Sequence, residues 1–171
     1  MGRASSTITT IMGRVLEVVR QSMQKIIPFL WFDTQAEEAM NFYVSIFKNS
    51  KIVSANRGPD GKVFTGTIRL DGQEIMVLNA GPQFKFNEAI SFFVTCKDQQ
   101  EVDYYWENLS AGGQTSQCGW LKDKFGLSWQ IIPTALGEML RNKDSEKAGR
   151  VMQAMLKMTK IDINGLKQAY E

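Results

Sequence analysis

The sequence predicts an α+β fold made of two copies of a βαβββ module followed by a helical tail. Two series of β-rich apolar runs are each interrupted by a stretch whose apolar residues have helical spacing. The two helical stretches carry an aromatic pair, Phe42-Tyr43 in the first and Tyr104-Tyr105 in the second. A pattern written twice in this way predicts two half-sheets related by a pseudo-twofold axis.

The first module begins with the apolar run IIPFLWF at residues 26–32, whose composition is typical of a strand. Residues 34–47 place apolar side chains at helical spacing, with Thr34 in the position of an N-cap. An Asp-Gly pair between the last two strands is a strong hairpin signal. The strands that complete the module are expected over residues 51–56, 63–70 and 73–79.

The second module repeats this order, with its helix over residues 98–111. The charged run Lys122-Asp123-Lys124 is typical of a solvated turn, and the glycines around it lack the spacing of a phosphate-binding loop. The strands of this module, including one or two short ones in its middle part, are expected within residues 89–96, 114–123 and 127–133.

The chain after Pro133 carries helical patterns only. Asp144 is expected to cap the second helix of this tail, with Glu146 in its first turn. An apolar, methionine-rich stripe on that helix is typical of a core or a subunit interface and consists of Met152, Met155, Leu156 and Met158. The three tail helices are expected within residues 134–142, 144–158 and 162–171.

The first 24 residues differ from the rest of the chain, because they carry three arginines and a single acidic residue. Organellar transit peptides share this composition, but a start at Met23 is the simpler explanation, and we favour it. We therefore expect a disordered or weakly helical extension over residues 1–24. One domain follows over residues 25–133, with its repeats at 25–80 and 88–133, and then the tail at 134–171.

The composition is that of a folded protein, with 43% hydrophobic residues, 22% charged residues and a net charge of +2. Basic residues form no long run, which argues against nucleic-acid binding. No apolar run approaches the roughly 20 residues needed to cross a bilayer. Cys96 and Cys118 lack a metal-binding spacing and are expected to be reduced thiols in a cytoplasmic protein, with a disulfide between them as the alternative.

The sequence contains no histidine. Histidine is the usual general base near neutral pH and the commonest metal ligand. Its absence excludes Ser-His-Asp and Cys-His catalysis and any two-histidine metal site. Carboxylates, lysines, tyrosines, thiols and amides remain as candidates for chemistry.

Three separated stretches, FLWFDTQAEEAMNFY, GWLKDKFGLSWQIIP and KAGRVMQAMLKMTKIDI, follow one another in this order. With the paired modules, they resemble the vicinal-oxygen-chelate superfamily of glyoxalase I, extradiol dioxygenases and bleomycin-resistance proteins. They closely resemble its PhnB-like branch, some members of which are named demethylubiquinone methyltransferase-like. The resemblance covers residues 25–171. It implies a curved mixed sheet around a cavity, each module forming half of the sheet with helices outside, and a homodimer.

Metal-dependent members of the superfamily place their ligands on the first and last strands of both modules. The resemblance puts those positions near Ile27, near Ala89, at Met76 or Val77, and at Gln130. Of these residues, only Gln130 carries an oxygen donor. A register shift on the strand of Met76 would bring in the carboxylate of Glu74 as a second donor. We therefore expect that the metal site of the superfamily is absent.

Strand alternation and the family register together indicate which side chains face the cavity. Gln130 shares its strand face with Ser128, while Trp129 and Ile131 point the other way. A buried amide costs about 1–3 kcal/mol unless it is hydrogen-bonded, so Gln130 either bonds a neighbouring strand or meets a ligand. For the aromatic residues, ordinary core packing is the alternative. The expected ligand-binding residues are Phe29, Trp31, Glu74, Met76, Ser91, Phe93, Ser128 and Gln130.

The leading function is the binding of a small, partly apolar molecule, without metal or other cofactor. The alternative is an isomerase, lyase or dioxygenase that depends on a metal or a carboxylate, with Glu74 as the only candidate base. Methyl transfer is not expected, because no glycine-rich loop follows a strand and opens a helix. Apart from the ligand and a second copy of the chain, we expect neither nucleic acid nor membrane as a partner.

Overall fold

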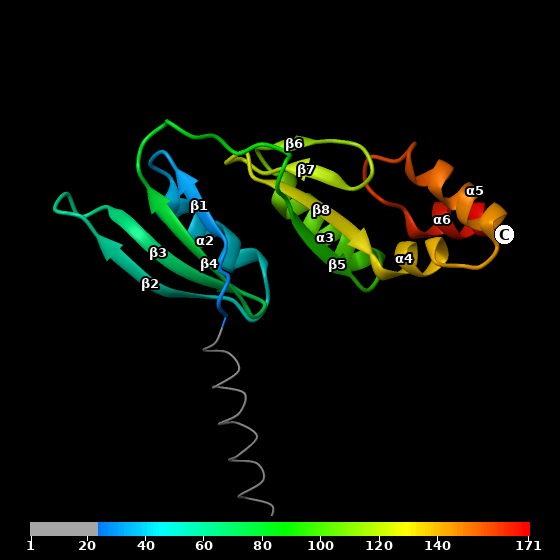
Figure 1. The fold of residues 1–171 in the computed structure, drawn as a ribbon, viewed down its shortest axis with the longest axis horizontal. Helices are drawn as coiled ribbons and strands as arrows, with labels where there is room; N and C mark the ends of the chain where they lie inside the picture. Colours follow the sequence, from blue (N-terminus) through cyan, green and yellow to red (C-terminus); the bar gives the residue numbers. More distant parts are fainter. Residues whose placement is uncertain (1–23) are drawn as a thin grey trace, which may run out of the picture. The chain divides into compact units, whose positions relative to one another are not determined.

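The computed structural model describes residues 24–171, so almost all of the predicted N-terminal extension lies outside the described residues (Figure 1). The chain divides into two compact units at residue 83, and each unit contains one four-stranded mixed sheet. Both sheets come from a βαβββ series, and helices follow the second series. The predicted α+β class is therefore confirmed. None of the helices within the described part is long and apolar enough to cross a membrane.

In the first unit, the strand order is β1-β4-β3-β2, with β1 parallel to β4 and the other pairs antiparallel. The helix of this unit, α2, spans Ala36–Ile46. The strands are β1 (Phe29–Phe32), β2 (Lys51–Arg57), β3 (Val63–Leu70) and β4 (Gln73–Asn79).

Helix α2 covers one face of this sheet and leaves the other face open. Its side chains Met40 and Tyr43 are fully buried, together with Ile68 of β3 and Val77 of β4. Gly66 lies in the middle of β3, and a Cβ atom there would lie 2.7 Å from the Sδ atom of Met40. The helix packs this closely because position 66 has no side chain.

The N-terminus of α2 is not capped by Thr34 as predicted. The helix begins at Ala36, and no side chain of its N-cap residue bonds the first turn. Instead, Oδ1 of Asn79 accepts a hydrogen bond of 2.8 Å from the backbone N–H of Ala36. The same amide donates to the carbonyl oxygen of Val63 at 2.8 Å. A residue at the end of β4 thus satisfies a free N–H of the helix, which no local motif at the helix start reveals.

The second unit repeats the topology, with the strand order β5-β8-β7-β6 and β5 parallel to β8. The predicted repetition of the βαβββ module is therefore confirmed. Helix α3 spans Gln99–Ser110. The strands are β5 (Phe92–Cys96), β6 (Gln114–Thr115), β7 (Trp120–Lys122) and β8 (Ser128–Pro133).

Of the charged run Lys122-Asp123-Lys124, only Lys124 lies in an exposed turn, which corrects the prediction for the other two residues. Lys122 belongs to β7, and Asp123 is only 3% exposed. Oδ1 of Asp123 accepts from the backbone N–H groups of Phe125 and Leu127 at 2.9 and 3.0 Å. Its Oδ2 accepts from Nε1 of Trp129 at 2.8 Å. A buried carboxylate therefore ties the β7–β8 turn to the core side of β8.

The tail forms the three predicted helices, α4 (Thr134–Leu140), α5 (Ser145–Met155) and α6 (Ile163–Tyr170). As predicted, Asp144 caps α5, accepting from the N–H groups of Glu146 and Lys147. Of the methionine-rich stripe, Met155 and Met158 pack on the tail core, whereas Met152 and Leu156 are exposed. The tail core consists of Leu136, Val151, Ile161 and Leu166.

Both the nitrogen and the oxygen of the Gln99 side-chain amide, in α3, form hydrogen bonds with the tail. Nε2 donates to the carbonyl oxygen of Ile161 at 3.1 Å, and Oε1 accepts from the N–H of Ile163 at 2.9 Å. An ion pair of 2.6 Å between Lys160 and Asp103 lies in the same contact. Polar contacts therefore hold the tail on α3, while Ile132 of β8 packs against the tail core.

We predict that Asp123→Ala lowers the free energy of unfolding by about 3 kcal/mol, because three donors lose a charged acceptor and two of their residues are buried. Urea unfolding followed by tryptophan fluorescence measures this change. Asp60→Ala is the control, because Asp60 is exposed and accepts one turn hydrogen bond, from the N–H of Lys62. Equal destabilisation by the two variants would contradict the structural role of Asp123.

Candidate functional site

The open face of the first sheet gathers the four site residues predicted in this unit. In the strand register, Phe29 lies beside Met76 and Trp31 beside Leu78. Because side chains alternate along a strand, these residues and Glu74 point away from α2. Phe29 is 55% exposed on this face. The indole Nε1 of Trp31 donates to the carbonyl oxygen of Gly81 at 2.8 Å, which fixes the orientation of the ring.

Glu74, the candidate base, is bonded to the guanidinium group of Arg69 on the neighbouring strand β3. Both side chains are about four-fifths buried, with 20% and 19% of their area exposed. The Nε atom of Arg69 is buried and has no hydrogen-bond partner among the described residues. The pair joins register neighbours on two adjacent strands, so Glu74 has a structural partner within the sheet.

The open face of the second sheet gathers the other four predicted residues. Phe93 of β5 and Trp120 of β7 flank Gln130 of β8 in register. Nε2 of Gln130 donates to Oγ of Ser91 at 2.9 Å. The ring of Phe93 is 57% exposed beside this hydrogen bond. The amide therefore has a partner on a neighbouring segment and also lies at an open aromatic surface, so both readings of Gln130 from the sequence remain compatible with its position.

Ser128 lies on the same face of β8 but differs from Gln130 in its surroundings. It is fully buried, and its Oγ has no hydrogen-bond partner among the described residues. Lys122 of β7 is its neighbour in register. The Nζ atom of Lys122 lies 2.5 Å from Oε1 of Glu88, in the segment before β5. This hydrogen bond to Lys122 lowers the pKa of the Glu88 carboxyl.

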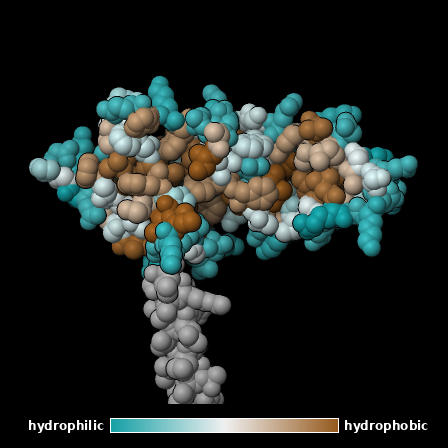
Figure 2. Space-filling model, viewed as in Figure 1, coloured by the Kyte–Doolittle hydropathy of each residue, from teal (hydrophilic) through white to brown (hydrophobic). Residues whose placement is uncertain are grey.

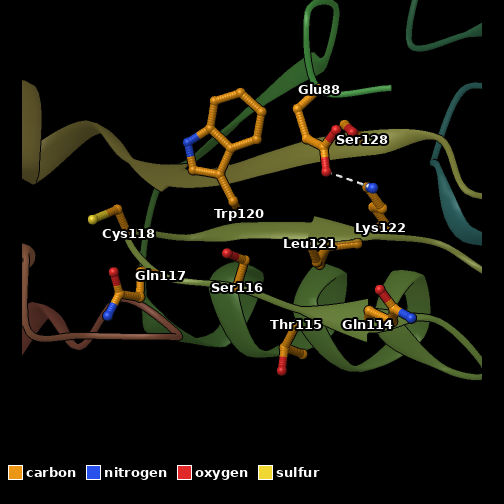
Figure 3. Close-up of a pocket in the computed structure, with 10 residues that line it drawn as sticks. All are labelled: Glu88, Gln114, Thr115, Ser116, Gln117, Cys118, Trp120, Leu121, Lys122 and Ser128. Atoms are coloured by element: carbon orange, nitrogen blue, oxygen red, sulfur yellow. Dashed lines mark ion pairs between the residues drawn. The ribbon is translucent and has the colours of Figure 1, made fainter. Parts of the chain in front are cut away.

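These side chains border a pocket of about 440 Å³ in the second unit (Figure 3). Sequence reasoning missed Glu88, Trp120 and Lys122. Trp120 and Lys122 are two residues apart and therefore share one face of β7. The sequence placed this short strand only somewhere within residues 114–123, so the shared face could not be recognised. The pocket is lined by Glu88, Gln114, Thr115, Ser116, Gln117, Cys118, Trp120, Leu121, Lys122 and Ser128.

The residues at the ligand positions of the superfamily do not fit a metal ion. Ile27 and Ala89 have apolar side chains and precede strands that begin later than predicted, at residues 29 and 92. Val77 is fully buried on the α2 side, so Met76 occupies the open-face position of β4. Gln130, whose Nε2 donates to Ser91, is thus the one of these residues with an oxygen donor on the open face. Within residues 24–171, no three His, Cys, Asp or Glu side chains gather as a metal-binding group.

The two cysteines differ in chemical accessibility. Both are free thiols. Burial raises the pKa of the Cys96 thiol to about 12, so this group stays protonated at neutral pH. Cys118 is partly exposed and lines the pocket. Its backbone has a φ of 59°, the left-handed region that residues other than glycine and asparagine rarely adopt.

Comparison with known proteins gives both a family and structural neighbours. The family model described as 3-demethylubiquinone-9 3-methyltransferase matches residues 24–132. No curated protein sequence matches the chain. A solved structure of a PhnB protein from Bacillus cereus, described as a putative 3-demethylubiquinone-9 3-methyltransferase, is 38% identical. The match covers 65% of this chain and 100% of that protein, with a TM-score of 0.62.

Two more distant structures also match. Protein PA1353 from Pseudomonas aeruginosa is 15% identical over 64% of this chain and 96% of its own, with a TM-score of 0.53. The fosfomycin resistance protein FosX from Listeria monocytogenes, solved with Mn(II), is 14% identical over 63% of this chain and 89% of its own, with a TM-score of 0.47. From the family model and the PhnB protein of Bacillus cereus, the chain belongs to the PhnB-like, 3-demethylubiquinone-9 3-methyltransferase family.

Proposed function

We propose that this PhnB-like protein binds a small, partly apolar molecule at the open faces of its sheets, without a metal ion. The observation that carries the proposal is the setting of Gln130. At the one family ligand position with an oxygen donor, the amide is bonded to Ser91 and flanked in register by Phe93 and Trp120. Aromatic rings with a few placed polar groups suit a planar organic ligand better than a hydrated cation.

Catalysis by a carboxylate is the second candidate, and the pairing of Glu74 with Arg69 weighs against it. The family description names a methyltransferase. The fold offers no support for methyl transfer, because each described sheet has a single parallel pair and lacks the doubly wound topology that binds nucleotide cofactors. We therefore propose a binding protein, in which the two open faces supply contacts but no acid–base chemistry.

We also propose that the protein assembles as a homodimer. Large apolar side chains reach the surface in each unit (Figure 2), and exposed apolar patches mark contacts with other molecules. Those on or beside the open faces include Phe29, Ile90 and Phe93, which are 55%, 63% and 57% exposed. A second copy of the chain would cover part of this surface.

We predict that Gln130→Leu weakens the binding of N-phenyl-1-naphthylamine about fivefold, because one hydrogen bond of about 1 kcal/mol is lost. This probe is a neutral aromatic amine whose N–H can donate to the amide oxygen of Gln130, and its fluorescence reports binding. The free energy of unfolding should stay within about 1 kcal/mol of the parent, since only the bond to Ser91 is removed.

Gln153→Leu is the matched control, because Gln153 is exposed on α5. Equal affinity of the parent and Gln130→Leu for the probe, or no binding at all, would count against the proposed site. An unfolded Gln130→Leu variant would show that Gln130 is a structural partner of Ser91 instead.

We predict that the purified protein, dialysed without chelator, carries far less than one divalent metal ion per chain, because the ligand positions hold apolar side chains apart from the single amide oxygen of Gln130. Elemental mass spectrometry measures the content. Near-stoichiometric metal that is lost in Gln130→Leu would overturn the metal-free proposal and favour a metal-dependent enzyme.

We predict a dimer at micromolar concentration in light scattering coupled to size exclusion. Substituting the exposed Phe93 by Ser should shift the equilibrium toward monomer, because an exposed aromatic ring contributes strongly to interfaces. Phe64→Ser, at a similarly exposed phenylalanine of β3, is the comparison. A parent protein that elutes as a monomer would remove the assembly claim.

A further inference from the structure

The pocket in the second unit holds an ion pair whose two partners differ in how firmly they are placed. Lys122 extends from β7, inside the sheet, and its side chain is 32% exposed. Glu88 comes from the irregular segment before β5, and its side chain is 63% exposed. Figure 3 shows the Glu88 carboxylate reaching across to the Lys122 ammonium beside Trp120. The carboxylate is therefore the partner that can leave, while the ammonium stays.

A second donor lies next to this ammonium. Ser128 is the register neighbour of Lys122 on β8, and such neighbours have Cβ atoms about 4.5–5.5 Å apart. Its hydroxyl is fully buried, lines the pocket and has no hydrogen-bond partner among the described residues. A buried hydroxyl without a partner is unfavourable. An acceptor placed at Lys122 could also receive the Ser128 O–H.

The third component is an aromatic wall. Trp120 lies two residues before Lys122 on the same face of β7 and lines the same pocket. Its register neighbour is Gln130, beyond which lies Phe93 on β5. A ligand ring that lies against Trp120 would therefore have the Lys122 ammonium at the end of β7 and the Gln130 amide on the neighbouring strand β8.

We propose that this pocket accepts a planar aromatic carboxylic acid, and that Glu88 occupies the position of the ligand carboxylate until the ligand displaces it. The ligand carboxylate pairs with Lys122 and accepts from Ser128, and its ring lies against Trp120. This inference rests on the proposed binding function and names its ligand class. Exposed ion pairs are weak, so exchange of one carboxylate for another costs little.

The two partners of the ion pair should then respond to substitution in opposite directions. Glu88→Gln removes the competing carboxylate and should tighten the binding of 2-naphthoate about threefold. Lys122→Met removes the charged donor but keeps an apolar stem, and should weaken binding about tenfold. A purely structural ion pair would give changes of the same sign in both variants, because either substitution breaks it.

The experiment is calorimetric titration of the full chain with 2-naphthoate, with neutral 2-naphthalenemethanol and with cationic 2-naphthylmethylamine. We expect 2-naphthoate to bind more tightly than the other two, with only its affinity depending on Lys122. Ser128→Ala should weaken 2-naphthoate about threefold and leave the folded state intact. Glu101→Gln is the control, because it removes the same charge from α3 and Gln keeps the acceptor that the N–H of Lys97 needs.

Each remaining outcome is decisive. If 2-naphthoate and the alcohol bind alike and Lys122→Met changes neither, the carboxylate site is wrong while the proposed binding function stands. If the amine binds most tightly and Glu88→Gln weakens it, Glu88 is itself the ligand group and the inference is overturned. If none of the three probes binds, the inference fails, and the proposed function fails with it when N-phenyl-1-naphthylamine does not bind either.

Discussion

The pairing register of the strands decides which side chains reach the open face of each sheet, because a shift of one residue would turn every side chain to the other face. In the second sheet, the Asp123 carboxylate anchors this register. It bonds the turn after β7 and the indole of Trp129 on the helix-covered side of β8. With Trp129 held there, Ser128 and Gln130 must point to the open face beside their neighbours on β7.

Periodicity predicted much of this arrangement. Along β8, alternation correctly separated the buried Trp129 and Ile131 from the half-buried Gln130, because one covered face imposes a clear pattern. It failed where a side chain depends on distant partners. The sequence around Asp123 is typical of a solvated turn, because the N–H donors of Leu127 and Trp129 reach its carboxylate only in the folded chain. The capping role of Asn79 likewise depends on the fold, which brings the end of β4 to the start of α2. Lys122 was missed because its strand is short and its partner lies in an irregular segment.

The two sheets share one topology but present different chemistry. In each, a strand that begins the module lies parallel to the strand that ends it, and the open face carries an exposed phenylalanine on the first of these strands. In the first sheet the ion pair joins Arg69 and Glu74 of one hairpin, and both side chains are largely buried. In the second sheet the cation, Lys122, lies on β7 and its partner Glu88 lies in the segment before β5, so this pair can open without movement of a strand.

The tail reaches the pocket through the backbone. The N–H groups of Cys118 and Gly119, in the loop that forms one pocket wall, donate to the carbonyl oxygens of Met158 and Thr159 at 2.8 Å each. The shape of that wall is therefore set by a segment outside the part of the chain that matches the family. If docking of the tail raises the affinity of this pocket for a ligand, binding of the ligand must strengthen docking of the tail by the same factor.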